Sequence, residues 1–336
     1  MRRFGAVVFV AGAAMTGVAC GGDDGPVTVR LVTYDSFPTK DTPLNEALAE
    51  FTADTGIGVE IVVAGDAGTM VTKAALTAGN PEGDVMWGVD NTLLSAATEA
   101  RVFDGDPAEV DRGDVCVNYD KSWFADKGLQ PPTTLDDLTK PEYRDLLVVQ
   151  DATTSSPGLA FMLATVARYG EDGWQQYWKD LVANGVEVVD SWSTAYYERF
   201  SGAAGSEGDR PLVVSYGTSP PAEVVFAEPP IDPTTGDAPT GVAEGTCFRQ
   251  VEYAGVLRGT DHADEARQLL GFLTGERFQR ELPLTLFVYP ANPTAALPEV
   301  FTRFAVSPAE PFTLDPTEIE TNRATWQQQW AAIAVG

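Results

Sequence analysis

Segments with strand character alternate with segments of helical spacing along the first third of the chain, and this alternation limits the possible folds more than any other feature. Runs rich in β-branched residues, such as 27–37 and 59–65, are each followed by a segment in which apolar residues recur every three or four positions. The same order recurs between residues 84 and 102. Strands that alternate with helices form parallel sheets covered by helices. We therefore predict an α/β fold.

A second alternating series follows at about residues 117–246, and it predicts a second α/β domain. Between the two series, from Phe103 to Gly128, the pattern is weaker, and only VCVNYD at 115–120 has strand character. The chain of 336 residues is long enough for two domains of ordinary size.

The first twenty residues have the features of an export signal. A basic start, MRRF, precedes a short apolar run, and TGVAC places small residues before Cys20. The pattern resembles a bacterial lipobox, in which the cysteine is lipidated, although Gly17 stands where leucine is usual. We expect a signal peptide at 1–19, a lipidated linker at 20–26, and an exported lipoprotein on the outer side of the cell membrane or in the periplasm. The alternative is a plain secretory signal with a spare cysteine.

The net charge excludes one large class of partner. The 22 basic residues fall to 20 when residues 1–19 are removed, against 49 acidic ones, so the mature chain has a net charge of about −29. Nucleic acid is excluded as a partner, because phosphate backbones require the opposite sign. The negative charge of the protein attracts cationic ligands. It is also typical of the solvent-exposed surface of a soluble exported protein.

Two cysteines, Cys116 and Cys247, remain in the exported chain. In an oxidising compartment the default is that they form one disulfide. The chain has one histidine, His262, and no CxxC motif, so we expect neither a metal site nor a cofactor. We expect the protein to be a monomer.

Five polar and aromatic stretches follow predicted strands. In parallel α/β sheets ligands bind beyond the carboxyl ends of the strands, so these loops would converge on a cleft. No single stretch indicates a ligand site by itself, because an aspartate at a strand end is commonly a helix cap. The five stretches are VTYDSF, WGVDN, QDATTSSPG, VDSWSTAY and VSYGTSP.

In these motifs the chain resembles the thiamine-binding proteins of bacterial ABC importers, within the iron- and polyamine-like group of extracytoplasmic solute-binding proteins. The resemblance covers about residues 27–330. It is carried, in order, by TYDSF, GVDNTLL, YDK, PEYRDLLVVQDATTSSPGL, SWSTAY, LVVSYGTSP and FVYPAN. One departure is Phe287, which stands where the family often has tryptophan.

The resemblance implies a type II periplasmic-binding-protein fold, with two α/β lobes, a ligand cleft and a hinge of crossing strands. Lobe 1 would comprise residues 27–115 and 248–300, and lobe 2 residues 116–247. Residues 301–336 would form a helical segment packed on the lobes; we interpret its Trp326 and Trp330, one helical turn apart, as packing residues. The ligand would be thiamine or a thiamine phosphate, passed to an ABC permease.

The resemblance also implies a set of ligand-binding residues. Aromatic walls would come from Tyr34, Trp192, Tyr216 and Phe287; polar contacts from Asp35, Ser36, Asp90 and Tyr289; and contacts to the hydroxyethyl or phosphate end from Thr154, Ser155 and Ser156. The loops that hold them add Asn91, Tyr196, Thr218 and Ser219. We expect Tyr197 and Phe200 to face the protein interior.

Two alternatives remain open. Thiaminases with a cleft cysteine share this fold and ligand, and Cys116 would be their nucleophile. A disulfide between Cys116 and Cys247, which we expect because both lie in the crossing strands, would exclude that reading. The second alternative is a binding protein for another small cation, such as a polyamine or ferric iron; iron is disfavoured because the loop SYGTSP lacks a tyrosine pair.

Overall fold

The computed structural model describes residues 27–336, so the predicted signal peptide, Cys20 and the linker lie outside the described residues. A nine-stranded sheet runs through the molecule in the order β2-β1-β3-β8-β4-β7-β5-β6, with β9 added beside β4. Its strands are β1 (Thr28–Thr33), β2 (Gly58–Val63), β3 (Val85–Asp90), β4 (Ala108–Asp120), β5 (Leu147–Gln150), β6 (Glu187–Val189), β7 (Leu212–Tyr216), β8 (Thr240–Val256) and β9 (Tyr289–Pro290).

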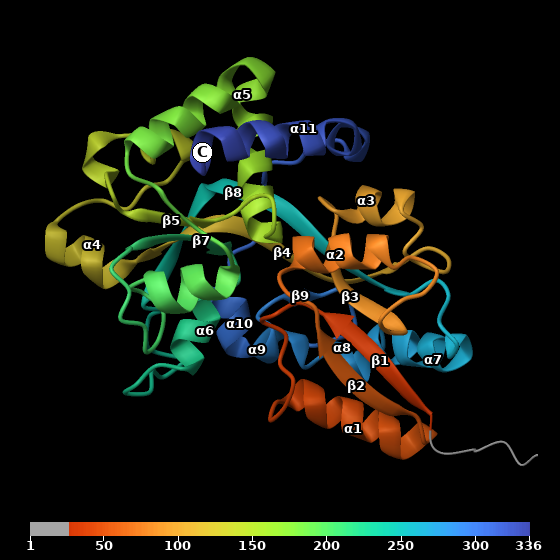
Figure 1. The fold of residues 1–336 in the computed structure, drawn as a ribbon. Coiled ribbons are helices and arrows are strands. Elements are labelled where there is room, and N and C mark those ends of the chain that lie inside the picture. Colours follow the sequence, from red (N-terminus) through yellow and green to blue (C-terminus); the bar gives the residue numbers. More distant parts are fainter. Residues whose placement is uncertain (1–26) are drawn as a thin grey trace, which may run out of the picture.

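Helices cover this sheet on both halves of the molecule (Figure 1). They are α1 (Pro43–Thr55), α2 (Ala67–Leu76), α3 (Leu94–Glu99), α4 (Lys121–Lys127), α5 (Ser156–Ala183), α6 (Pro220–Val225), α7 (Ala263–Leu273), α8 (Glu276–Gln279), α9 (Leu282–Thr285), α10 (Glu299–Phe304) and α11 (Pro316–Ala334). Among the described residues, no helix is long and apolar enough to cross a membrane.

Two long strands, β4 and β8, join the halves. They pair antiparallel from Ala108 opposite Ala254 to Asp120 opposite Thr240, with register shifts at Val110 and at Cys116. In Figure 1 they pass between the yellow and green elements on the left and the red and orange elements on the right. The disulfide Cys116–Cys247 links the two strands near their middle, which confirms the predicted pairing.

The first half is built on the parallel strands β1, β2 and β3, as the alternating pattern predicts. Its helix α1 illustrates how local sequence sets an element. Thr42 and Asn45 form a capping box and Pro43 occupies the first turn, where its missing N–H is not needed. Gly56 ends the helix in the left-handed conformation, with φ of 76°. The apolar face of α1 packs into the core against β1 and β3.

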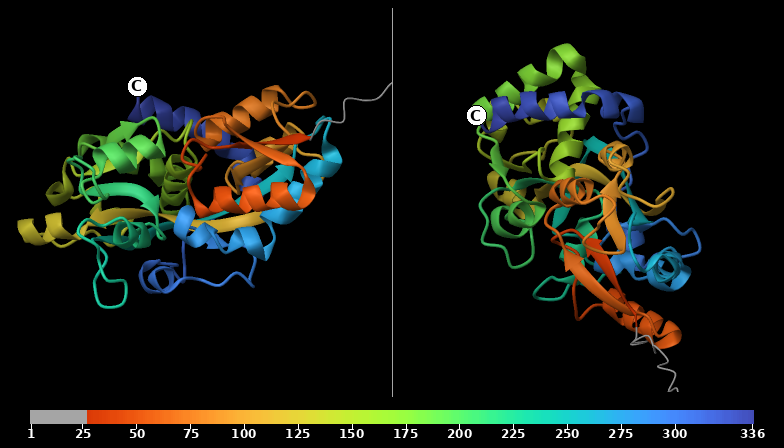
Figure 2. Two further views of the ribbon diagram at one scale, coloured as in Figure 1. Left: turned by 90° about the horizontal axis from the view of Figure 1, so that it is seen from below. Right: turned by 45° about the vertical axis from the view of Figure 1, so that its right-hand side comes forward.

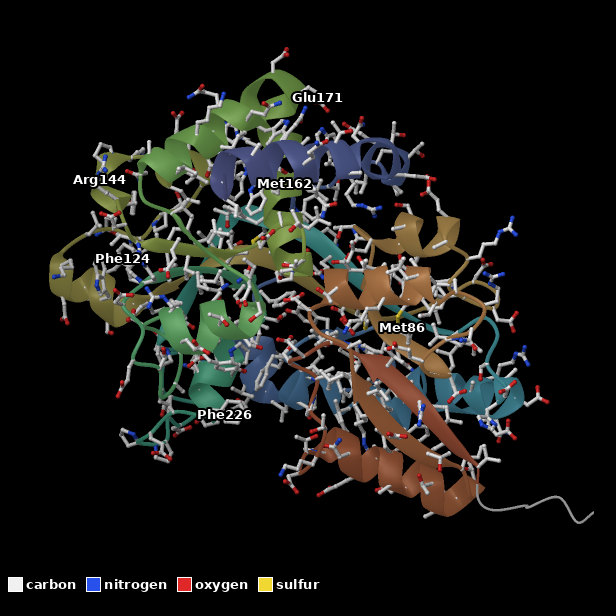
Figure 3. All side chains as sticks on the ribbon, viewed as in Figure 1. Met86, Phe124, Arg144, Met162, Glu171 and Phe226 are labelled. Atoms are coloured by element: carbon white, nitrogen blue, oxygen red, sulfur yellow. A yellow bond between two sulfur atoms is a disulfide. The ribbon has the colours of Figure 1, made fainter. Side chains whose placement is uncertain are left out.

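The second half is built on β5, β6 and β7, which are also parallel. Its main helix, α5, bends at Gly170, where φ is 67°. This glycine divides α5 into two arms, residues 156–169 and 171–183. The first arm, which contains Met162 (labelled in Figure 3), is buried on all sides from Ser156 to Val166, whereas the second arm buries one face that includes Trp178.

The last helix, α11, contacts both halves. Its Arg323 donates to the carbonyl of Thr92 at 3.1 Å, and its Gln327 to the carbonyl of Ala152 at 2.7 Å. Trp326 and Trp330 are 1% and 0% exposed, so their interpretation as packing residues is confirmed. The right-hand view of Figure 2 shows this blue helix lying along α5.

The structure corrects one part of the pattern reading. Residues 108–114 belong to strand β4, although their sequence AEVDRGD does not look like a strand. Asp111 and Asp114 are buried in the sheet at 1% and 4% exposure. Buried carboxyl groups replace the apolar residues on which strand prediction depends, so this half of the strand was missed.

Candidate functional site: a cavity between the two halves

A cavity of about 300 Å³ lies between the two halves. The first half lines it with the turn after β1, the start of α2 and the segment after α9. The second half contributes the start of α5, the turn at 192–197, the end of β7 and helix α6. The lining residues are Tyr34, Asp35, Ser36, Asp66, Ala67, Ser156, Pro157, Trp192, Tyr196, Tyr197, Ala204, Tyr216, Ser219, Ala222, Glu223, Phe226, Glu252, Thr285, Leu286, Phe287 and Val288.

A cluster of aromatic rings forms the wall on the second half. Trp192 stacks on Tyr196, with ring centroids 4.8 Å apart and an angle of 17° between the planes. Tyr197 meets Trp192 edge-on at 5.3 Å. The indole Nε1 of Trp192 donates to the Ser215 hydroxyl at 3.0 Å, which fixes the ring orientation. The indole is thus held in place before any ligand arrives.

Tyr34 provides a ring on the opposite wall, and a glycine makes room for it. A Cβ at Gly88 would lie 2.3 Å from Cδ1 of Tyr34, and Gly88 has φ of +109°. The register of β3 against β8 shifts at this residue, so the strand bulges where the ring crosses it. Any side chain at position 88 would displace Tyr34.

Acidic groups surround the aromatic rings. Asp66 caps α2, accepting from the Ala67 amide at 2.7 Å, and lies 3.4 Å from the Trp192 amide of the other half. Burial, with a smaller contribution from Asp35, raises the pKa of Asp66 to about 6. Burial also raises the pKa of Glu223, which accepts from the Tyr196 hydroxyl at 2.8 Å.

Glu252 of β8 lines the floor of the cavity and is otherwise buried. Burial raises the pKa of Glu252 well above its usual value, and the neighbouring charges of Asp111 and Asp90 raise it further. The described lining residues include no lysine or arginine. The cavity therefore favours a flat ligand with positive charge and disfavours an anion.

Nine of the predicted ligand-binding residues lie on the cavity wall, and the structure brings them together from both halves. They are Tyr34, Asp35, Ser36, Ser156, Trp192, Tyr196, Tyr216, Ser219 and Phe287.

The other six predicted residues do not line the cavity, and two of them, Asp90 and Asn91, are held by hydrogen bonds within the protein. Asp90 is fully buried and accepts from Ser156, Gln250 and Thr92. The Asn91 side chain donates to the carbonyl of Arg249 at 3.2 Å and accepts from the amide of Val251.

The remaining four lie off the cavity wall for different reasons. Thr154 donates its hydroxyl to the carbonyl of Asp190 at 3.3 Å and presents its own carbonyl to α2. Ser155 and Thr218 are 2% and 0% exposed behind the wall. Tyr289 packs edge-on against Phe301 and lies beneath the Arg112 guanidinium. These six lie beside or behind the cavity wall, and their contact with a ligand stays a prediction.

The structure also adds residues that the motifs did not indicate. Tyr197 is 57% exposed and lines the cavity, so the expectation that it faces inward was wrong; Phe200 is fully buried as expected. The turn at Thr194–Arg199 is wound as a π-helix, which places Tyr197 out of phase with a regular helix. Asp66, Glu223 and Glu252 were missed because an isolated acid in a helix or strand carries no distinguishing sequence signal.

The two halves touch around the mouth of the cavity. Phe226 at the end of α6, labelled in Figure 3, meets the ring of Phe287 from the first half at 5.8 Å. Ser193 lies 3.3 Å from the carboxylate of Asp35. Each contact joins residues from opposite halves, so the cavity closes only when the halves approach.

A glycine permits the closest of these approaches. A Cβ at Gly68, in the first turn of α2, would lie 2.4 Å from the carbonyl oxygen of Thr154 in the other half. We expect Gly68→Ala to hinder closure and weaken ligand binding about tenfold, the scale of an overpacking cost of 1–3 kcal/mol. Chemical denaturation should show no loss of stability, because alanine favours a helix more than glycine does.

The matched control is Gly271→Ala in α7, where an added Cβ meets nothing within 4 Å. This variant should bind like the unaltered protein. Equal affinities for the two variants would mean that the halves do not close against Gly68 when ligand binds.

The fold and its cavity define a binding protein whose two halves enclose a small molecule. The chain belongs to the bacterial extracellular solute-binding protein family, which it matches over residues 35–280. This confirms the solute-binding class that the motifs suggested.

Proteins named for thiamine are among its relatives. The thiamine-binding periplasmic protein of Salmonella typhimurium is 29% identical over 90% of this chain and 92% of its own length. That of Brucella suis is 27% identical over 91% of each chain. A solved periplasmic thiamin binding protein superposes with a TM-score of 0.80 at 25% identity, covering 93% of this chain and 98% of its own.

Iron-bound HitA from Pseudomonas aeruginosa shares the fold, with a TM-score of 0.65 at 17% identity, over 91% of this chain and 99% of its own. These similarities confirm the predicted two-lobed binding-protein fold. Among the described residues, no cluster of three or more His, Cys, Asp or Glu side chains is arranged to hold a metal ion.

Proposed function

We propose that this protein captures thiamine in the cavity between its halves and delivers it to an ABC importer, as an exported lipoprotein anchored through Cys20. The observation that carries the proposal is the lining of the cavity, which combines aromatic rings from both halves with four acids and no basic residue among the described lining. Thiamine is a flat pyrimidine joined to a cationic thiazolium, so ring faces and carboxyl groups suit both of its parts.

The same lining favours free thiamine over its phosphates. A phosphate would need cations or free amide donors, and the Ser156 hydroxyl at the start of α5 already donates to Asp90. The relatives named as thiamine-binding proteins support the assignment independently. The domain division at residues 115–116 and 247–248 falls within β4 and β8, and we propose that these strands act as the hinge.

A thiaminase-like enzyme is the second candidate, since it would take the same ligand. It requires a thiolate at Cys116, and in the structure this sulfur is bonded to Cys247. The bond supports a receptor rather than an enzyme.

The test is calorimetric titration of residues 27–336 with thiamine, thiamine monophosphate, thiamine diphosphate and spermidine, with mass spectrometry of the thiamine afterwards. We expect one-to-one binding that is tightest for thiamine, with thiamine recovered intact. Cleaved thiamine would show that the protein is an enzyme. Binding of spermidine without binding of thiamine would show that the ligand is a polyamine. Failure of every thiamine form to bind would contradict the proposal.

A further inference from the structure

Three carboxyl groups lie in a row across the middle of the sheet. Glu252 of β8 is directly opposite Asp90 of β3 on one side and Asp111 of β4 on the other. Residues opposite each other on neighbouring strands point to the same face, with Cβ atoms about 5 Å apart. The exposed fractions are 0% for Asp90, 8% for Glu252 and 1% for Asp111, so the row is buried.

The members of the row differ in their partners. Asp90 accepts hydrogen bonds from Ser156, Gln250 and Thr92, which favour its charged form and oppose the burial that raises its pKa. No charged or hydroxyl donor is paired with either carboxyl oxygen of Asp111 or with Oε2 of Glu252. The two carboxyl groups lie within hydrogen-bonding reach of each other and of the Trp87 indole. An ionised carboxylate without partners is costly to bury, and two facing each other are costlier still.

One member of the pair has direct access to a ligand. Glu252 lines the cavity, whereas Asp111 is 1% exposed and is not among the residues that line it. Burial raises the pKa of Asp111 to about 7, and raises that of Glu252 well above its usual value. Two acids that interact this closely titrate as a unit rather than one by one.

The other titratable groups around the pair are identified by their elements. Tyr34 follows β1 and Tyr216 ends β7; burial raises the pKa of both hydroxyls well above the usual value, so they stay neutral near pH 7. The charged neighbours are Asp90, and Asp66 at the start of α2, both acids. Asp66, with its pKa near 6, is mostly ionised at pH 7.

We propose that Asp111 and Glu252 hold a proton between them in the empty cavity, and that a cationic ligand releases this proton to solvent when it binds. The positive charge of the ligand then takes the place of the proton in balancing the pair. This inference rests on the proposed function, because it takes thiamine as the cation. The protonation of Asp111 and Glu252 would then depend on the charge of the bound ligand.

The direction of the pH dependence follows from linkage. The complex holds fewer protons than the free protein, so affinity rises with pH wherever the free pair is still protonated. We expect thiamine affinity to increase between pH 6.5 and 8, by up to about tenfold per unit for one released proton. The neutral tyrosines do not contribute in this range.

The experiment is calorimetric titration with thiamine at pH 7 in phosphate and in Tris, two buffers with very different ionisation enthalpies. The difference between the two observed enthalpies gives the number of protons released, which we expect to be about one per thiamine. Equal enthalpies in both buffers, with clear binding in each, would overturn this inference and leave the thiamine function standing. Absence of thiamine binding, checked also by tryptophan fluorescence, would contradict the function itself.

Variants of Glu252 and Asp111 test whether these two acids hold the proton that is released. Glu252→Gln should abolish the release and flatten the pH profile, with affinity lowered at least tenfold; Asp111→Asn provides the same test should the first variant fold poorly. The matched control is Glu109→Gln, an exposed acid on the same strand β4, which should release the proton as the unaltered protein does. Undiminished release from both Glu252→Gln and Asp111→Asn would show that the proton comes from another acid.

Discussion

Replacing Trp192 by alanine is expected to weaken thiamine binding by about 1–3 kcal/mol, which corresponds to a loss of roughly 5- to 150-fold in affinity. Trp192 stacks on Tyr196 and is fixed by its hydrogen bond to Ser215, so one ring face is supported by the protein. The variant would remove a preorganised surface for a cationic or aromatic ring. Calorimetry of the two proteins side by side measures the difference.

Two further variants make this test specific. Trp192→Phe keeps an aromatic face but loses the bond to Ser215, and it should fall between alanine and the unaltered protein. Trp123→Ala removes an indole in α4, which packs on Phe124 away from the cavity, and should bind thiamine normally. Unchanged affinity in a folded Trp192→Ala variant would remove this residue from the site.

Removing the disulfide is expected to have the largest effect on stability. The bond joins residues 131 positions apart, and closing a loop of this length restricts the unfolded chain strongly. We expect Cys116→Ala combined with Cys247→Ala to lower the free energy of unfolding by about 2–5 kcal/mol. Alanine is preferable to serine here, because both positions are buried and a hydroxyl would lack partners.

Chemical denaturation with and without a reductant provides the comparison. The unaltered protein should lose stability when reduced, whereas the double variant should not respond. Equal stability of the two proteins under oxidising conditions would contradict the expected role of the bond. Thiamine binding by the double variant, with intact thiamine recovered, would further separate the receptor from a cysteine-dependent enzyme.

Much of the fold could be predicted from the sequence because it depends on local patterns. Pro43 and Gly56 indicate the two ends of helix α1, and a run of apolar residues indicates strand β3. The first half of β4 could not be predicted, because Asp111 and Asp114 occupy interior positions. A pattern of apolar residues cannot reveal a strand whose buried positions hold acids.

The site was predicted in part, and the division has a physical basis. Aromatic residues in polar loops, such as Trp192 and Tyr34, stand out because loops seldom need large rings. Glu252 sits inside a long strand, and Asp66 has the sequence signature of an ordinary helix cap. Their positions at the cavity depend on pairing between strands and on the approach of the two halves, neither of which a single sequence displays.

The crystal structure of the complex with thiamine tests the central claim most directly. We predict that thiamine occupies the cavity between the halves, with one ring against Trp192 and Tyr34 and its cationic ring within reach of Glu252. Thiamine bound outside this cavity, or a cavity that stays empty at saturating thiamine, would contradict the account.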